Sequence, residues 1–218
     1  RYDKNDKNDR HISKKNQHVA SQHNNNNKNN NKEFSESRRA ELAIADMTRH
    51  YYQTHNLTLA QHPSETVERM MLRLVAFTLC ADERLLFGKG ISEDSEPDLW
   101  QHNLSGEIEL WVELGLPDEK LLRRASHRAK QGFVLAYGGT VVDKWWKDAQ
   151  KSALELNNLT VVAINADESA ALATLCQRSM QLQCTIQEGQ LWFADNQQSV
   201  VINPVVLKSA ASPLFTLE

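Results

Sequence analysis

The stretch EPDLWQHNLSGEIELWVELGLPDEK carries two carboxylates whose spacing suits metal chemistry. Asp98 follows a proline, and Glu113 comes after a segment long enough for a short turn between two strands. Mg²⁺ and Mn²⁺ favour oxygen ligands, and a metal held by carboxylates activates water for attack on a phosphodiester. In many metal-dependent nucleases a lysine stands two positions after the second acid, and Gly115 occupies that position here. The pattern therefore predicts a carboxylate metal site whose positive side chain comes from elsewhere.

A third acid completes the predicted metal ligands. Glu65 lies in HPSETVERMMLRLVAFTLC, the strongest helix signal of the chain, with Pro63 suited to a first helical position. We expect Glu65, Asp98 and Glu113 to share one Mg²⁺ or Mn²⁺ ion. The alternative interpretation is that Glu65 serves the helix dipole, Asp98 a turn and Glu113 a solvated strand face.

Three basic residues are candidates for the missing lysine. Lys120, at the start of the next helix, is the preferred replacement, and Lys89, at the end of the preceding strand, is the second catalytic candidate. Arg123 is a third option. The alternative is that all three are solvated surface charges.

The predicted helix 119–131 is strongly basic and follows the acidic strand directly. This polarity suits a surface that guides a phosphate backbone toward a metal. Arg123, Arg124 and Arg128 are accordingly predicted to contact nucleic acid. A run of charges on a helix is also typical of a plain exposed face.

Alternating strands and periodic helices must position these side chains. In GEIELWVELG, Ile108, Leu110, Val112 and Leu114 are expected on one face, with Trp111 among the glutamates on the other. In the first helix, Glu65, Glu68, Arg69 and Arg73 lie off the apolar stripe. Further expected elements are strands at 40–46, 85–90, 133–139 and 159–165, a helix around Trp145–Trp146, a helix from 165 through Met180, and hairpins over 181–203.

This order of elements predicts a mixed α/β or α+β fold. We expect a mixed sheet flanked by helices, with a C-terminal antiparallel meander. Residues 36–218 are predicted to form a single domain. Residues 1–35 are dominated by Asn, Lys, Asp and His and are predicted to be a disordered leader. Because the first methionine is Met47, a start-site or reading-frame artefact is one interpretation of this leader.

The charge and the cysteines narrow the class of protein. The formal charge is −3, but the leader is basic and the remainder acidic, which argues against a generic coat for nucleic acid. Three isolated cysteines favour reduced, buried thiols in a cytoplasmic protein. No segment resembles a secretory signal or a membrane span.

Several blocks of the chain resemble a known family. AQHPSETVERMMLRLVAF, LLFGKGISEDSEPDLW, IELWVELGLPDEKLLRRAS and the WW pair closely resemble successive blocks of the YaeQ family of bacterial proteins. The resemblance runs from about residue 40 to near the C-terminus and implies a restriction-endonuclease-like variant of the PD-(D/E)XK nuclease fold. KEFSESRR stands where family members have a methionine and the start of a strand.

Two hypotheses follow from these residues. The first is metal-dependent hydrolysis of phosphodiesters in nucleic acid at Glu65, Asp98 and Glu113. The second is a catalytically degenerate module that binds protein or nucleic acid, which Gly115 and the acidic charge favour. The sequence does not indicate an oligomeric state.

Overall fold

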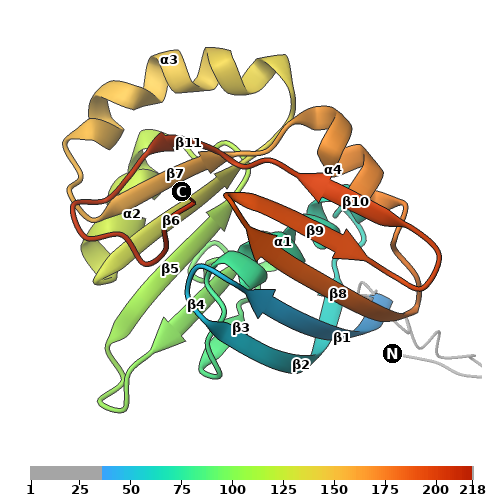
Figure 1. Cartoon of the computed structure of the whole chain (residues 1–218). Coiled ribbons are helices and arrows are strands. Elements are labelled where there is room, and N and C mark those ends of the chain that lie inside the picture. The colour runs from blue at the N-terminus through green and yellow to red at the C-terminus, as the bar shows by residue number, and fades with distance from the viewer. Residues whose placement is uncertain (1–35, 218) are drawn as a thin grey trace, which may run out of the picture. The chain divides into compact units, whose positions relative to one another are not determined.

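The computed structural model describes residues 36–217. The predicted leader, residues 1–35, lies outside the described residues. The described part is a mixed α+β unit with two sheets and four α-helices, which confirms the predicted fold class (Figure 1). The single mixed sheet of the prediction is in fact two sheets, because the C-terminal meander joins the N-terminal strands.

The five-stranded sheet combines the first two strands of the described chain with three strands from its C-terminal part. Its meander is antiparallel as predicted, and β1 pairs with β8 in parallel and with β2 antiparallel. In spatial order the strands are β10 (Ser199–Ile202), β9 (Gln190–Ala194), β8 (Ser179–Gln187), β1 (Glu36–Asp46) and β2 (Tyr51–Gln61).

The six-stranded sheet carries the predicted carboxylate strand at its centre. Its middle strands β5, β6 and β7 are parallel, and the remaining pairs are antiparallel. In spatial order the strands are β11 (Val205–Lys208), β7 (Leu159–Ala163), β6 (Gln131–Ala136), β5 (Ile108–Leu114), β4 (Leu99–His102) and β3 (Leu85–Phe87).

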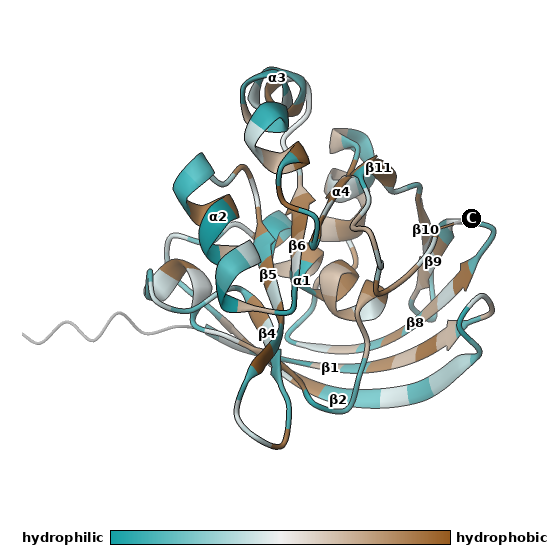
Figure 2. Cartoon of the chain, turned by 90° about the vertical axis from the view of Figure 1, so that its left-hand side faces the viewer, coloured by the Kyte–Doolittle hydropathy of each residue, from teal (hydrophilic) through white to brown (hydrophobic). Residues whose placement is uncertain are grey.

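The helices cover both faces of the six-stranded sheet. One apolar core joins α1 to residues of both sheets, and Figure 2 shows α1 between them. On the opposite face, α2 and α3 pack over β5, β6 and β7. The helices are α1 (Val67–Leu79), α2 (Glu119–Arg128), α3 (Thr140–Leu154) and α4 (Ala166–Ala173), with a short 3-10 turn η1 (Gly90–Ser92). None of the helices in residues 36–217 combines the length and apolar character that a membrane crossing needs.

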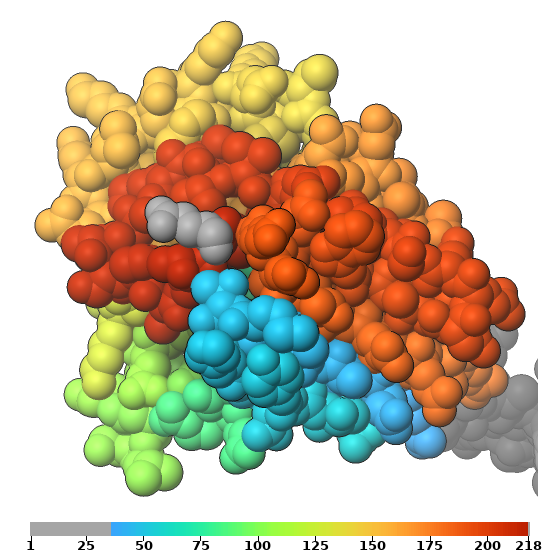
Figure 3. Space-filling view, in the orientation of Figure 1, coloured from blue at the N-terminus to red at the C-terminus, as the bar shows by residue number. Residues whose placement is uncertain are grey.

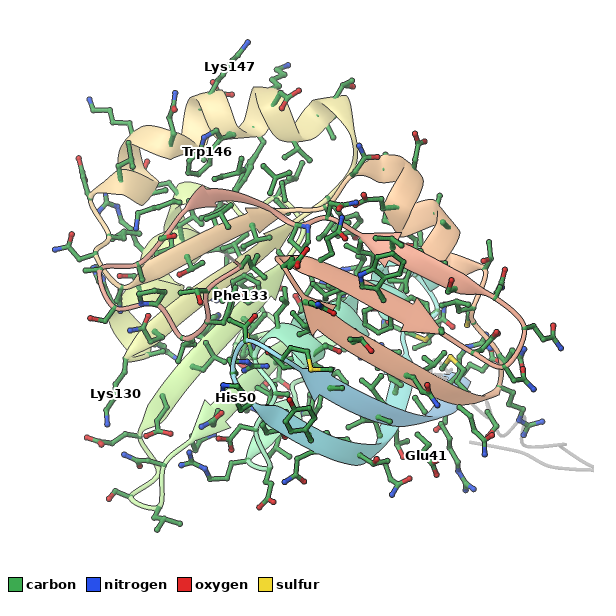
Figure 4. The ribbon with its side chains drawn as sticks, in the orientation of Figure 1. Glu41, His50, Lys130, Phe133, Trp146 and Lys147 are labelled. Carbon is green, nitrogen blue, oxygen red and sulfur yellow. The ribbon has the colours of Figure 1, made fainter. Side chains whose placement is uncertain are left out.

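Side chains on α3 and β6 show this layering directly. Figure 4 shows Lys147 projecting away from the sheet and Trp146 on the inner side of α3. Trp146 packs against the cluster that contains Val134 and Val161. Phe133 points to the other face of the sheet, where it is buried and makes an edge-on contact with Phe215.

The strand β5 alternates as predicted, but neither of its faces is open. Leu110, Val112 and Leu114 enter the core beneath α1. Trp111, expected on an outer face, is fully buried under Ala125 of α2. Ile108 packs on this second side as well, next to the register shift between β4 and β5 at Gln101–His102.

Two helix boundaries differ from the prediction. The helix α1 begins at Val67 and not near Pro63, because the Thr66 hydroxyl accepts the Arg69 N–H and caps the helix. The helix α4 ends at Ala173, whereas Met180 was expected to end it. Met180 lies in β8, where alternate residues are buried and paired with β1.

The C-terminal segment packs over the junction of the two sheets. Figure 3 shows this segment on the surface between the N-terminal strands and α3. The Gln131 side chain donates to the Ser212 carbonyl at 2.9 Å, which ties the segment to β6.

Candidate functional site

A cavity of about 410 Å³ lies beside the ends of β4 and β5, under the start of α2. Both strands deliver a carboxylate to it, because Asp98 immediately precedes β4 and Glu113 lies near the end of β5. The charged residues of its wall are Arg69, Asp94, Glu96, Asp98, Glu113, Asp118, Lys120 and Arg124. Acids outnumber bases on this wall, so the cavity favours a cation.

Asp98 is fixed by the backbone of β5. Its N–H donates to the Val112 carbonyl at 3.0 Å, and its Oδ2 accepts the Leu114 N–H at 2.7 Å. The residue is 2% exposed. These contacts hold Asp98 beside Glu113, so the structure brings the two predicted ligands together.

Glu113 is a largely buried acid that lacks an ion-pair partner among the salt bridges of residues 36–217. The Trp111 indole N–H donates to its Oε1 at 2.7 Å. Burial and, to a smaller extent, the charge of Asp98 raise the pKa of Glu113 to about 7, against the lowering effect of the indole hydrogen bond and of Arg69 and Arg124. Such a carboxylate is only partly ionised near neutral pH, and a nearby cation would favour its charged form.

Glu65 is placed differently from the other two acids. It precedes the cap of α1 and lines a second cavity of about 270 Å³, adjacent to the first. Its Oε1 accepts from Arg69 at 2.9 Å and its Oε2 from Arg73 at 2.8 Å. Glu65 is 5% exposed, so the two guanidinium groups balance its buried charge.

Arg69 connects the two cavities and lines both. Besides its bond to Glu65, it donates to Asp98 Oδ1 at 2.6 Å. Burial alone would lower the pKa of Arg69, but Asp98 and Glu65 raise it. The motif of predicted ligands does not include this residue. Glu65, Arg69 and Arg73 follow one another at the spacing of helical turns, and this pattern could have indicated an ion-pair ladder.

The predicted cations take different positions. Lys120 lines the first cavity, whereas Lys89 lines the second and pairs with Glu93 at 2.7 Å. Arg123 pairs with Glu119 and Glu155 outside the first cavity. Of the candidates for the missing lysine, Lys120 is therefore the one that shares a cavity with Asp98 and Glu113.

The other two arginines of α2 also differ from each other. Arg124 lines the first cavity and donates to the Asp94 carbonyl at 2.5 Å. Arg128 is exposed at the last position of α2. A ligand in the cavity could contact Arg124, and only a longer ligand could reach Arg128.

Similarity to known proteins covers this whole region. The family model described as "YaeQ protein" matches residues 34–204. The chain belongs to the YaeQ family. It is 39% identical to YaeQ of Escherichia coli K12 over 165 residues, which are 76% of this chain and 91% of the relative. It is 40% identical to YaeQ of Salmonella typhi over 164 residues, which are 75% and 91% of the two chains.

Solved YaeQ structures share the fold. The crystal structure of YaeQ from Xanthomonas axonopodis pv. citri has a TM-score of 0.78 and 45% identity, over 80% of this chain and 98% of that one. YaeQ from Pseudomonas syringae has a TM-score of 0.77 and 31% identity, over 82% and 98%. The YaeQ match includes both cavities and every predicted site residue.

The backbone at Gly115 accounts for the absence of a lysine at this point of the YaeQ chain. Gly115 follows β5 with φ of +103°, and its N–H donates to the Leu135 carbonyl at 2.9 Å. Side chains other than hydrogen are disfavoured in this conformation. The positive charges on the cavity wall therefore come from other elements, namely Arg69 of α1 and Lys120 and Arg124 of α2.

The carboxylates provide only some of the ligands that a divalent ion requires. Among residues 36–217, no group of three or more His, Cys, Asp or Glu side chains is placed to hold a metal. Mg²⁺, however, is often held by one or two carboxylates together with water and substrate phosphates. Asp98 and Glu113 match that number of carboxylates. Asp98 Oδ1 accepts from Arg69 and its Oδ2 from the Leu114 N–H, whereas both oxygens of Glu65 accept from arginines.

Proposed function

We propose that this YaeQ-family protein hydrolyses phosphodiesters of nucleic acid with Mg²⁺ or Mn²⁺ held by Asp98 and Glu113. The observation that carries the proposal is the pairing of these acids in one cavity, with the pKa of Glu113 raised to about 7 by burial and by Asp98. A divalent cation beside Asp98 would favour the charged form of Glu113. Perturbed acids in a cleft are typical of functional sites.

The basic residues of α2 suit the remaining tasks of this reaction. The bound metal would supply a water of lowered pKa and positive charge beside the phosphate. Lys120 is proposed to donate to the attacking water or to a phosphate oxygen from the wall of the cavity. Arg124 and the exposed Arg128 would contact backbone phosphates, and Arg123, held by two glutamates, would lie at the edge of that surface.

A second function is a module that binds nucleic acid or protein without cleaving it. The ion-pair network of Glu65 with Arg69 and Arg73 favours it, because this network neutralises the third predicted ligand. Lys89, also predicted as catalytic, is 63% exposed and bound to acids of its own loop. Under this alternative, Lys120 and Arg124 would serve binding alone.

Titration of the full chain with Mn²⁺, followed by calorimetry, separates the two functions. We expect binding at millimolar or lower concentration, weakened more than about tenfold in Glu113→Gln and in Asp98→Asn. Asp118→Asn is the matched control, because it removes a charge from the same cavity wall and keeps a side chain that can cap α2. Its affinity should stay within about twofold of the wild type, since exposed charges interact weakly.

Activity is then measured with fluorogenic single-stranded and double-stranded DNA and RNA. Lys120→Ala should lower the cleavage rate about a hundredfold, as expected when a charge that stabilises the transition state is removed. A folded protein that binds no Mn²⁺ would rule out the metal-dependent reaction and leave the binding module.

A further inference from the structure

Arg69 already supplies a positive charge where the metal is proposed to bind. Its guanidinium reaches Asp98 Oδ1 at 2.6 Å and Glu65 Oε1 at 2.9 Å, and its side chain is 15% exposed. It is the basic residue of α1 that lines the cavity shared by Asp98 and Glu113. Arg73, one turn further on, pairs with Glu65 and does not line that cavity.

The surroundings of Asp98 leave little room for a second cation. Oδ2 is engaged by the Leu114 N–H, and Oδ1 by Arg69. The Gly90 main chain closes over Oδ1, because a Cβ built on Gly90 would collide with that oxygen. A metal ion that binds Asp98 must therefore take the position of the Arg69 guanidinium or share its acceptor.

We propose that Arg69 is an internal counter-ion that competes with the divalent metal for Asp98. The proposal rests on the metal site of the proposed function. In the metal-free protein Arg69 neutralises Asp98, and on metal binding it gives up this contact. Arg69 acts as a positioning residue, since its effect on the reaction passes through Asp98.

The geometry provides a place for the released side chain. Its second contact, with Glu65, lies on the side of the adjacent cavity, which Arg69 also lines. The guanidinium can stay paired with Glu65 and move into that cavity of about 270 Å³. A buried positive charge thus keeps one partner in both states, which avoids the cost of an unpaired ion.

Mn²⁺ titration by calorimetry tests this competition in full-length variants. In Arg69→Gln, we expect the dissociation constant for Mn²⁺ to fall by about tenfold or more, within the usual range of coupling between two sites. Arg69→Lys restores a positive charge beside Asp98 and should return the affinity toward the wild-type value. A purely structural role of Arg69 would weaken binding in both variants.

Arg124→Gln is the matched control. Arg124 lines the same cavity and lowers the pKa of Glu113, but its side chain donates to the Asp94 carbonyl and not to Asp98. Arg124→Gln therefore removes one positive charge from the cavity wall but leaves the contact between Arg69 and Asp98 in place. We expect its Mn²⁺ affinity to rise by less than about threefold, as for a partly screened charge.

The outcomes separate this inference from the proposed function. If the wild type binds Mn²⁺ and Arg69→Gln binds it equally or more weakly, the competition is refuted and the metal site stands. If Arg124→Gln gains as much as Arg69→Gln, direct competition is also refuted. If neither the wild type nor Arg69→Gln binds Mn²⁺, both proposals fail.

If Arg69→Gln is less stable than the wild type, its melting temperature is measured with and without Mn²⁺. Saturating Mn²⁺ should then raise its melting temperature by more than that of the wild type, because the metal replaces the lost charge. A variant that Mn²⁺ does not stabilise would contradict the inference.

Discussion

Glu65 and Glu113 lie in adjacent cavities and are both largely buried, but their surroundings differ. Glu65 accepts from two guanidinium groups, whereas Glu113 accepts from a neutral indole and faces another carboxylate. The first acid therefore belongs to a compensated network that supports the fold. The second lacks an ion-pair partner among residues 36–217 and is only partly ionised near neutral pH. This difference supports the proposed metal site at Asp98 and Glu113.

Removing the compensated acid should have the largest effect. Glu65→Ala leaves the buried Arg73, which is 5% exposed, without its carboxylate partner. We expect a loss of about 3–5 kcal/mol in the free energy of unfolding, measured by urea denaturation at pH 8. Glu41→Ala, at an exposed position of β1 that is labelled in Figure 4, is the control and should change it by less than about 0.5 kcal/mol. A loss below about 1 kcal/mol in Glu65→Ala would contradict the conclusion that Glu65, unlike Glu113, stabilises the fold through its ion pairs.

Changing the uncompensated acid should alter the pH dependence of stability. The pKa of Glu113 rises from 4.5 in the unfolded chain to about 7 in the folded protein. The folded state thus binds more protons between these values, and its stability falls as the pH rises from 4.5 to 7. Glu113→Gln should remove on the order of 2–3 kcal/mol of that change.

Urea denaturation at pH 5 and pH 8 measures the effect. The difference in free energy of unfolding between the two pH values should be smaller in Glu113→Gln than in the wild type. In the control Glu41→Gln, the difference in free energy of unfolding between the two pH values should equal that of the wild type. An unchanged difference in Glu113→Gln would mean that Glu113 ionises in the folded protein as it does in water.

A third acid of the cavity wall should give the smallest effect. Asp118 is exposed and caps α2, accepting the Leu121 N–H at 2.8 Å. Asp118→Ala should cost about 1 kcal/mol in the free energy of unfolding at pH 7, and Asp118→Asn much less, because asparagine also caps helices. Equal losses in the two variants would point to the charge and not to the cap.

The sequence predicted the local parts of this site better than their arrangement. The spacing of Asp98 and Glu113 suits two paired strands, and the structure places both acids on the wall of one cavity. The alternating positions of Leu110, Val112 and Leu114 likewise predict that these three side chains share one face of the strand. The burial of Trp111 was not, since the glutamates around it indicated a solvated face and α2 covers it only in the folded chain.

The contact of Arg69 with Asp98 could not be predicted for a similar reason. Its place off the apolar stripe of α1 was correct, and such a position usually means exposure to solvent. It is buried because Asp98 is brought over it by a strand distant in sequence. The division of the three predicted ligands between two cavities depends on this long-range contact. The sequence shows the residue types but not which charges are neutralised.

The parallel pair of β1 and β8 has a consequence for the order in which the molecule can be completed. Arg39 of β1 is paired with Ser179 of β8, so the first described strand can pair on this side only after the last third of the chain has begun to be made. Contacts that span so much sequence are slow to form. During synthesis, the strands β5, β6 and β7 are made before the five-stranded sheet can close. A chain cut before β8 would keep both carboxylate strands but leave one side of β1 without its partner strand.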